Sequence, residues 1–124
     1  MCKSTAIALL LVISLAPACY AVDADNDRSN GHFNGRFWSG LNNNSKAAFI
    51  LGYCEGASDC PIQPTFGDIV KGVDKFYQEP ENLRLAIRSA IRVFALKVAG
   101  ANASDIEDAM RFARAYADSA DPKK

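Results

Sequence analysis

The chain has 124 residues, and its 14 basic and 14 acidic side chains give a formal net charge of zero. This balance does not indicate binding to nucleic acid or to an anionic membrane surface. The length is that of one domain with a single core.

Residues 1–21 have the pattern of a secretory signal peptide. Lys3 supplies the positive start, an apolar run follows over residues 6–16, and small residues precede a predicted cleavage site after Ala21. The run is shorter than the roughly 18 residues of a membrane span, which argues against a transmembrane anchor. An alternative makes Cys19 the lipidated first residue of a bacterial lipoprotein, but no bulky aliphatic residue stands in the three positions before it. We therefore expect a periplasmic or secreted protein.

Loss of the leader removes two of the four cysteines and leaves Cys54 and Cys60. In an exported protein, two thiols so close in sequence most simply form a disulfide. The closed loop is short and is worth only about 2 kcal/mol by loop entropy, so we expect it to fix one corner of the fold. Metal binding is the alternative, but it needs ligands beyond two sulfurs and one histidine, His32. We expect no cofactor, because no phosphate-binding glycine loop or metal-ligand spacing occurs.

Residues 22–34 are rich in Asp and Asn and lack an apolar period, which predicts a mobile tether that carries His32 in solvent. A single helical domain is expected over residues 35–120, followed by a frayed tail at 121–124. Within residues 35–41, Trp38 is expected to cover the core, and the alternative is an aromatic anchor for a partner.

Two short helices are predicted next. The first covers residues 46–55 after a run of capping residues, with Ala47, Ile50, Leu51 and Cys54 on one face. The second covers residues 66–78, with Thr65 and Asp68 as its capping box. Gly72 weakens that helix, which suggests close contact with a neighbour.

The longest helical pattern, residues 83–99, is expected to be the central helix. A last helix over residues 105–119, capped by Ser104 and Glu107, has small alanines that would let it lie close to the central one. No strand alternation is present. The predicted fold is all-α, a bundle of about four short helices in an antiparallel arrangement with a disulfide-pinned corner.

Three arginines, Arg84, Arg88 and Arg92, recur every four residues of the predicted central helix and form one basic stripe. Such a stripe is either a solvated face paired with neighbouring acids or a docking surface for an acidic partner. The carboxylates Glu55, Asp59 and Asp68 gather near the disulfide corner, where they are either caps and solvated charges or an acid and base pair.

The order of landmarks over residues 38–99 resembles the Rap1a/Tai group of exported bacterial immunity proteins. The motifs are Trp38 and Leu41, GYCEG at 52–56, the Cys60-Pro61 pair, DIV at 68–70 and FYQEPEN at 76–82. The last phrase is also similar to one shared by small uncharacterised exported bacterial proteins. The resemblance implies an all-helical periplasmic protein, often dimeric, that blocks an injected peptidoglycan amidase. The group's second cysteine, at the end of the long helix, is replaced here by Ala99-Gly100-Ala101.

Three functions follow as hypotheses. The first is an exported module that binds another protein through Arg84, Arg88, Arg92 and Trp38. An immunity-type inhibitor is one form of this hypothesis. The second is a small hydrolase that uses Glu55, Asp59 or Asp68. The third is a self-associating structural protein of the envelope, a homodimer being the simplest form. We expect that the protein is not an enzyme, because the sequence offers no clear general base to activate a serine or cysteine nucleophile.

Overall fold

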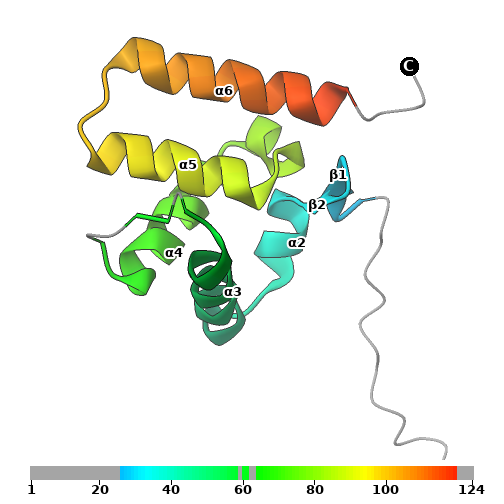
Figure 1. The fold of residues 1–124 in the computed structure, drawn as a ribbon. Helices are drawn as coiled ribbons and strands as arrows, with labels where there is room; N and C mark the ends of the chain where they lie inside the picture. The colour runs from blue at the N-terminus through cyan, green and yellow to red at the C-terminus, as the bar shows by residue number, and fades with distance from the viewer. Residues whose placement is uncertain (1–25, 59, 62–63, 120–124) are drawn as a thin grey trace, which may run out of the picture.

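The computed structural model describes residues 26–58, 60–61 and 64–119. The predicted signal peptide, Cys19, Asp59 and the predicted tail lie outside these residues. The fold is small and all-α, as predicted, with one short hairpin added (Figure 1). Its elements are β1 (Arg28–Ser29), β2 (His32–Phe33), α2 (Gly35–Gly40), α3 (Asn43–Gly56), α4 (Phe66–Phe76), the 3-10 helix η1 (Pro80–Arg84), α5 (Ile87–Val98) and α6 (Ala103–Asp118).

The described part of the predicted tether, residues 26–34, forms a hairpin that the sequence analysis does not predict. Strands β1 and β2 pair antiparallel, with Arg28 opposite Phe33 and Ser29 opposite His32. Asn30 and Gly31 connect them with φ angles of 50° and 75°. These angles fit a type I′ turn, whose twist matches that of paired strands and which Asn-Gly adopts readily.

Asn34 joins this hairpin to the helices. It is fully buried, and its amide nitrogen donates to the carbonyl oxygen of Asn26 at 2.9 Å. Its side-chain oxygen caps α2 by accepting from the backbone N–H groups of Arg36 and Phe37. Asn34 also forms a β-bridge with Ala86, just before α5. A buried amide with these partners fixes the position of the hairpin on the domain.

Helix caps decide where α3, α4 and α6 begin. Asn42 caps α3, and Thr65 and Asp68 form the predicted capping box of α4. The prediction for α6 is wrong by two residues, because Asn102 rather than Ser104 is the N-cap and accepts from the N–H of Asp105 at 2.9 Å. Gly72 of α4 faces Phe94 of α5 so closely that a Cβ would overlap the ring, which confirms the predicted close contact.

The central helix is shorter than predicted. α5 begins at Ile87 rather than at residue 83, because η1 ends at Arg84 and the next two residues are extended. The buried hydroxyl of Tyr77 donates to the carbonyl oxygen of Leu85 at 2.9 Å, and burial raises the pKa of this phenol well above its ordinary value. Tertiary hydrogen bonds therefore keep this part of the chain extended, although the apolar period of the sequence predicts that the helix continues through it.

α5 nevertheless has the central position, between α4 on one side and α6 on the other (Figure 1). α6 lies antiparallel along α5, as expected from its alanines, while α3 runs across their direction, so the bundle is not wholly antiparallel. Leu51, predicted to lie on the apolar face of its helix, is 44% exposed because no described element covers it. The buried apolar core consists of Trp38, Ile50, Ile69, Val70, Val73, Tyr77, Ile87, Ala90 and Ile91.

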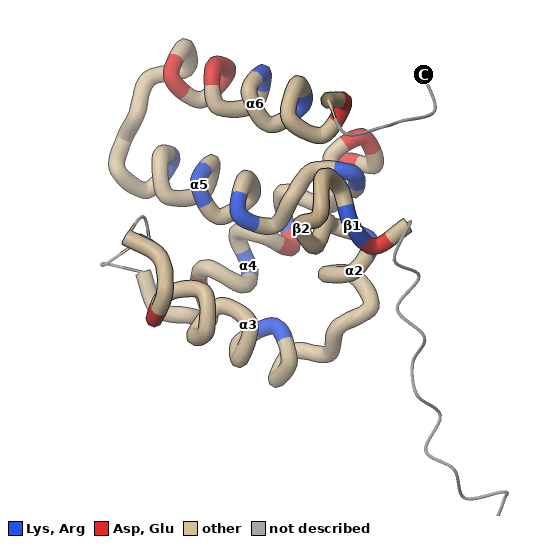
Figure 2. Tube along the Cα trace, turned by 45° about the vertical axis from the view of Figure 1, so that its right-hand side comes forward, with Lys and Arg blue, Asp and Glu red and all other residues tan. Residues whose placement is uncertain are grey.

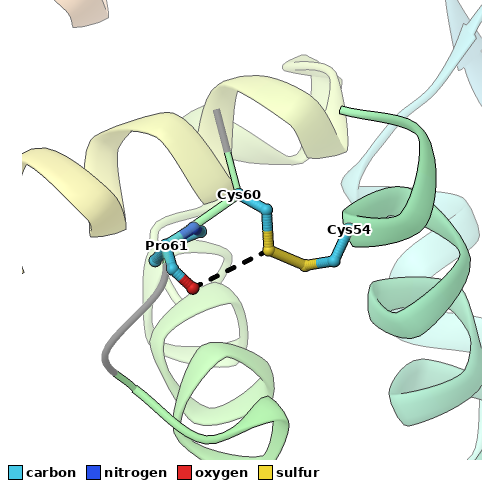
Figure 3. Close-up of a disulfide and its surroundings, with 3 residues drawn as sticks. All are labelled: Cys54, Cys60 and Pro61. Carbon is cyan, nitrogen blue, oxygen red and sulfur yellow. Dashed lines mark hydrogen bonds between the residues drawn. A yellow bond between two sulfur atoms is a disulfide. The ribbon is translucent and has the colours of Figure 1, made fainter. Parts of the chain in front are cut away.

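The predicted disulfide is present. Cys54 lies in the last turns of α3 and Cys60 in the segment that leads to α4, with their Cα atoms 5.0 Å apart (Figure 3). The Sγ atom of Cys60 lies 3.8 Å from the carbonyl oxygen of Pro61. The bond therefore pins the corner between α3 and α4, as expected from the spacing.

Candidate functional site

A cleft of about 290 Å³ lies where the hairpin meets α3 and α5. Its lining combines basic with apolar side chains, together with the backbone of the turn. The lining residues are Arg28, Gly31, His32, Phe33, Phe49, Tyr53, Ile87 and Arg88. The three basic residues are exposed, whereas the four apolar ones are partly or fully buried. The cleft thus has a basic mouth and an apolar interior, and none of the described residues that line it is acidic.

Aromatic packing fixes the interior wall. The ring of Phe33 stacks on that of Phe37 with centroids 3.9 Å apart, and it meets Phe49 edge-on at 6.4 Å. These contacts attach β2 to α2 and α3. A wall held by such contacts is rigid before any ligand arrives.

Arg28 lies against this wall. Its guanidinium carbon is 4.2 Å from the centroid of Phe33, the residue directly opposite it in the hairpin. One of its nitrogens also donates to the carbonyl oxygen of Gly31 at 3.4 Å. Because a guanidinium has five N–H donors, most of them remain for a ligand.

Arg88 supplies the second guanidinium from the first turn of α5. Its guanidinium carbon lies 5.7 Å from the ring centroid of Tyr116 on α6, and the ring of His32 lies 5.9 Å from the same tyrosine. Tyr116 thus contacts two of the three basic residues at the mouth. Among the described residues, the ion pairs do not include Arg28 or Arg88.

The three arginines of the predicted stripe lie on two helices and have different surroundings. Arg84 belongs to η1 and pairs with Asp118 of α6. This pair agrees with the interpretation that the arginines pair with acidic residues of neighbouring helices. Arg88 reaches the cleft, and Arg92 is exposed one turn further along α5 without lining it. Figure 2 shows these basic segments on η1 and α5 and a further one on β1. The stripe is interrupted because η1 and α5 are separate helices.

Trp38 lies in the core. Only 1% of it is exposed, and its Nε1–H donates to a carboxylate oxygen of Asp74 at 2.7 Å. The same oxygen accepts from the ammonium of Lys46 at 2.8 Å. The expectation that Trp38 covers the core is confirmed, and its alternative role as an anchor for a partner is wrong, because a buried indole has no surface to offer.

The two described carboxylates of the hydrolase hypothesis, Glu55 and Asp68, are absent from the cleft lining. Asp68 serves the capping box, where the hydroxyl and then the backbone N–H of Thr65 donate to its carboxylate and lower its pKa. A lowered pKa keeps the group ionised, which is the reverse of what a general acid needs. Glu55 is exposed, and Asp59 lies outside the described residues.

Four residues of the site, Arg28, Gly31, His32 and Phe33, lie in the segment whose composition predicts a mobile tether. The signal that could have found them is the Asn30-Gly31 pair, which is a strong short-range indication of a hairpin. A hairpin there places Arg28 and Phe33 opposite each other. No pattern in the local sequence predicts that these hairpin residues pack against α3 and α5.

Within the part of the chain that the structure describes, no cluster of three or more His, Cys, Asp or Glu side chains is arranged to hold a metal ion. Likewise, none of the helices described is both long enough and apolar enough to span a membrane. Comparison of this chain with known protein families, curated proteins and solved structures finds no match.

Proposed function

We propose that this protein is an exported protein-binding module that captures a carboxylate of its partner in the cleft. The observation that carries the proposal is the mouth of the cleft, where Arg28 and Arg88 lie beside aromatic rings and form no ion pair with the acidic residues that the structure describes. Arginine forms strong, geometrically specific pairs with carboxylates, more so beside a dry apolar wall.

Export is supported by the leader-like pattern of residues 1–21 and by the disulfide between Cys54 and Cys60. Disulfides persist in the oxidising compartments outside the cytosol. The motif resemblance over residues 38–99 makes an immunity-type inhibitor the specific form of the proposal. In that form the partner is a cell-wall amidase toxin, and its inhibition needs no chemistry from this chain.

The test is capture of a partner from an envelope extract of the source cells by the tagged full-length protein. Arg88→Glu places a negative charge in the cleft, and we expect it to reduce capture of the dominant partner at least about tenfold, because like charges at an interface repel. Mass spectrometry of the bound fraction measures the loss.

The matched control is Arg111→Glu, which makes the same charge change on α6, outside the cleft lining, at a residue paired with Asp108. We expect this variant to retain the partner. Equal capture by both variants and the parent protein would count against the cleft. Recovery of this chain alone would point instead to self-association, the simplest form of the structural alternative.

A further inference from the structure

We infer that the occupant of the cleft is the C-terminal residue of a partner polypeptide, an apolar residue whose free α-carboxylate pairs with Arg28 and Arg88. The inference rests on the proposed function and specifies the chemical group that the cleft selects. It follows from the charge, the apolar wall and the size of the cleft.

The charge at the mouth selects a single anionic group. Arg28 and Arg88 come from different elements, line the same cleft, and are each placed beside an aromatic ring, Phe33 and Tyr116 respectively. Side chains that are already positioned lose less conformational freedom on binding. Within residues 26–58, 60–61 and 64–119, no carboxylate lines the cleft to compete for them.

The apolar interior selects what the anion is attached to. Phe33, Phe49 and Tyr53, which are partly exposed, form the surface of this interior, and the buried Ile87 lies behind it with almost no surface of its own. An aspartate or glutamate side chain brings only one or two methylene groups and would leave these rings largely uncovered. A C-terminal apolar residue brings a hydrocarbon side chain and a carboxylate on the same residue, so it satisfies both parts of the lining.

The size limits the occupant to about one residue. A cleft of about 290 Å³ lies just below the usual range for ligand pockets, about 300–1,000 Å³. A chain end can enter with one residue, whereas an internal residue must bring main chain both in and out.

The experiment is calorimetric titration of the full-length protein with N-acetyl-phenylalanine and with its amide, N-acetyl-phenylalaninamide. We expect the acid to bind at least about tenfold more tightly than the amide, since the amide lacks the charge that the arginines recognise. Arg88→Gln and Arg28→Gln should each reduce the affinity for the acid about tenfold or more. Arg111→Gln, on an exposed side chain of α6 outside the cleft, should leave it unchanged.

Further ligands separate the possible sources of the carboxylate. A six-residue peptide that ends in a free phenylalanine should bind at least as tightly as N-acetyl-phenylalanine, and amidation of its C-terminus should abolish this. If the peptide fails while the single residue binds, the site takes small carboxylates and the inference is overturned. Tighter binding of inorganic phosphate than of N-acetyl-phenylalanine also overturns it.

Failure of the inference can be told apart from failure of the proposed function. If N-acetyl-aspartate methylamide binds as tightly as N-acetyl-phenylalanine, the cleft reads a side-chain carboxylate. The inference then fails, although the proposed function stands. If N-acetyl-phenylalanine binds through Arg88 but Arg88→Glu leaves partner capture intact, the inference about the ligand stands and the proposed function fails. The far-ultraviolet circular dichroism of each variant must match that of the parent protein for these outcomes to count.

Discussion

Asp74 shows how much a single residue can depend on its tertiary neighbours. The helical period places it on the outer face of α4, yet its carboxylate accepts from Trp38 of α2 and from Lys46 of α3. The ammonium of Lys46 also lies 5.5 Å from the indole centroid. One carboxylate thus links three helices, and the buried indole N–H has the partner that its burial requires.

Replacement of Trp38 by Phe tests this link. The variant loses the hydrogen bond to Asp74 and leaves a small void in the core, so we expect the free energy of unfolding to fall by about 2–3 kcal/mol. Urea unfolding followed by circular dichroism measures the change, because Trp38 is the only tryptophan and the variant has no indole fluorescence. Phe112→Leu, at a ring that is 60% exposed, is the control and should change stability by less than about 0.5 kcal/mol. A similarly small change for Trp38→Phe would contradict the assigned role.

At the scale of whole elements, packing of α4 against α5 depends on the absence of a side chain at Gly72. The ring of Phe94 occupies the space that a Cβ would take. Glycine is a poor helix former, so its presence within α4 reflects this contact rather than helix propensity. The same pair of helices carries most of the buried apolar core.

Alanine at two helical glycines separates propensity from packing. Gly72→Ala should lower the free energy of unfolding by about 1–3 kcal/mol, because the methyl group overlaps the Phe94 ring. Gly52→Ala in α3, where a Cβ meets nothing within 4 Å, should raise it by about 0.5–1 kcal/mol through helix propensity. Thermal unfolding of both variants provides the comparison. Stabilisation by both substitutions would show that the contact at Gly72 is unimportant.

Across the whole molecule, the disulfide lies at the edge of the main core, because Cys54 packs against the buried cluster without belonging to it. The bond ties the end of α3 to the segment before α4, while the core extends from Trp38 and Ile50 to Ile91 of α5. α6 contributes only one fully buried residue, Ala113. The fold should therefore survive loss of the bridge with reduced stability.

The double variant with Cys54→Ser and Cys60→Ser should remain folded and lose about 2 kcal/mol of stability, the loop-entropy value for so short a closed loop. Chemical denaturation measures the loss, and circular dichroism checks that the helical content persists. Dithiothreitol should destabilise the parent protein by a similar amount and leave the double variant unchanged. Complete unfolding of the double variant would mean that the bridge does more than pin one corner.

Local sequence determined most of the helices, the Thr65–Asp68 capping box and the Cys54–Cys60 pairing, because caps, helical periods and short cysteine spacings act over a few residues. Tertiary structure alone decided where α5 begins, why Arg84 is separated from Arg88, and where the cleft lies. The cleft draws its lining from residues 28–33, 49–53 and 87–88, and no short-range pattern connects segments so far apart. The hairpin is intermediate: the Asn30-Gly31 turn is visible in the sequence, but its place on the domain depends on the buried Asn34 and its bridge to Ala86.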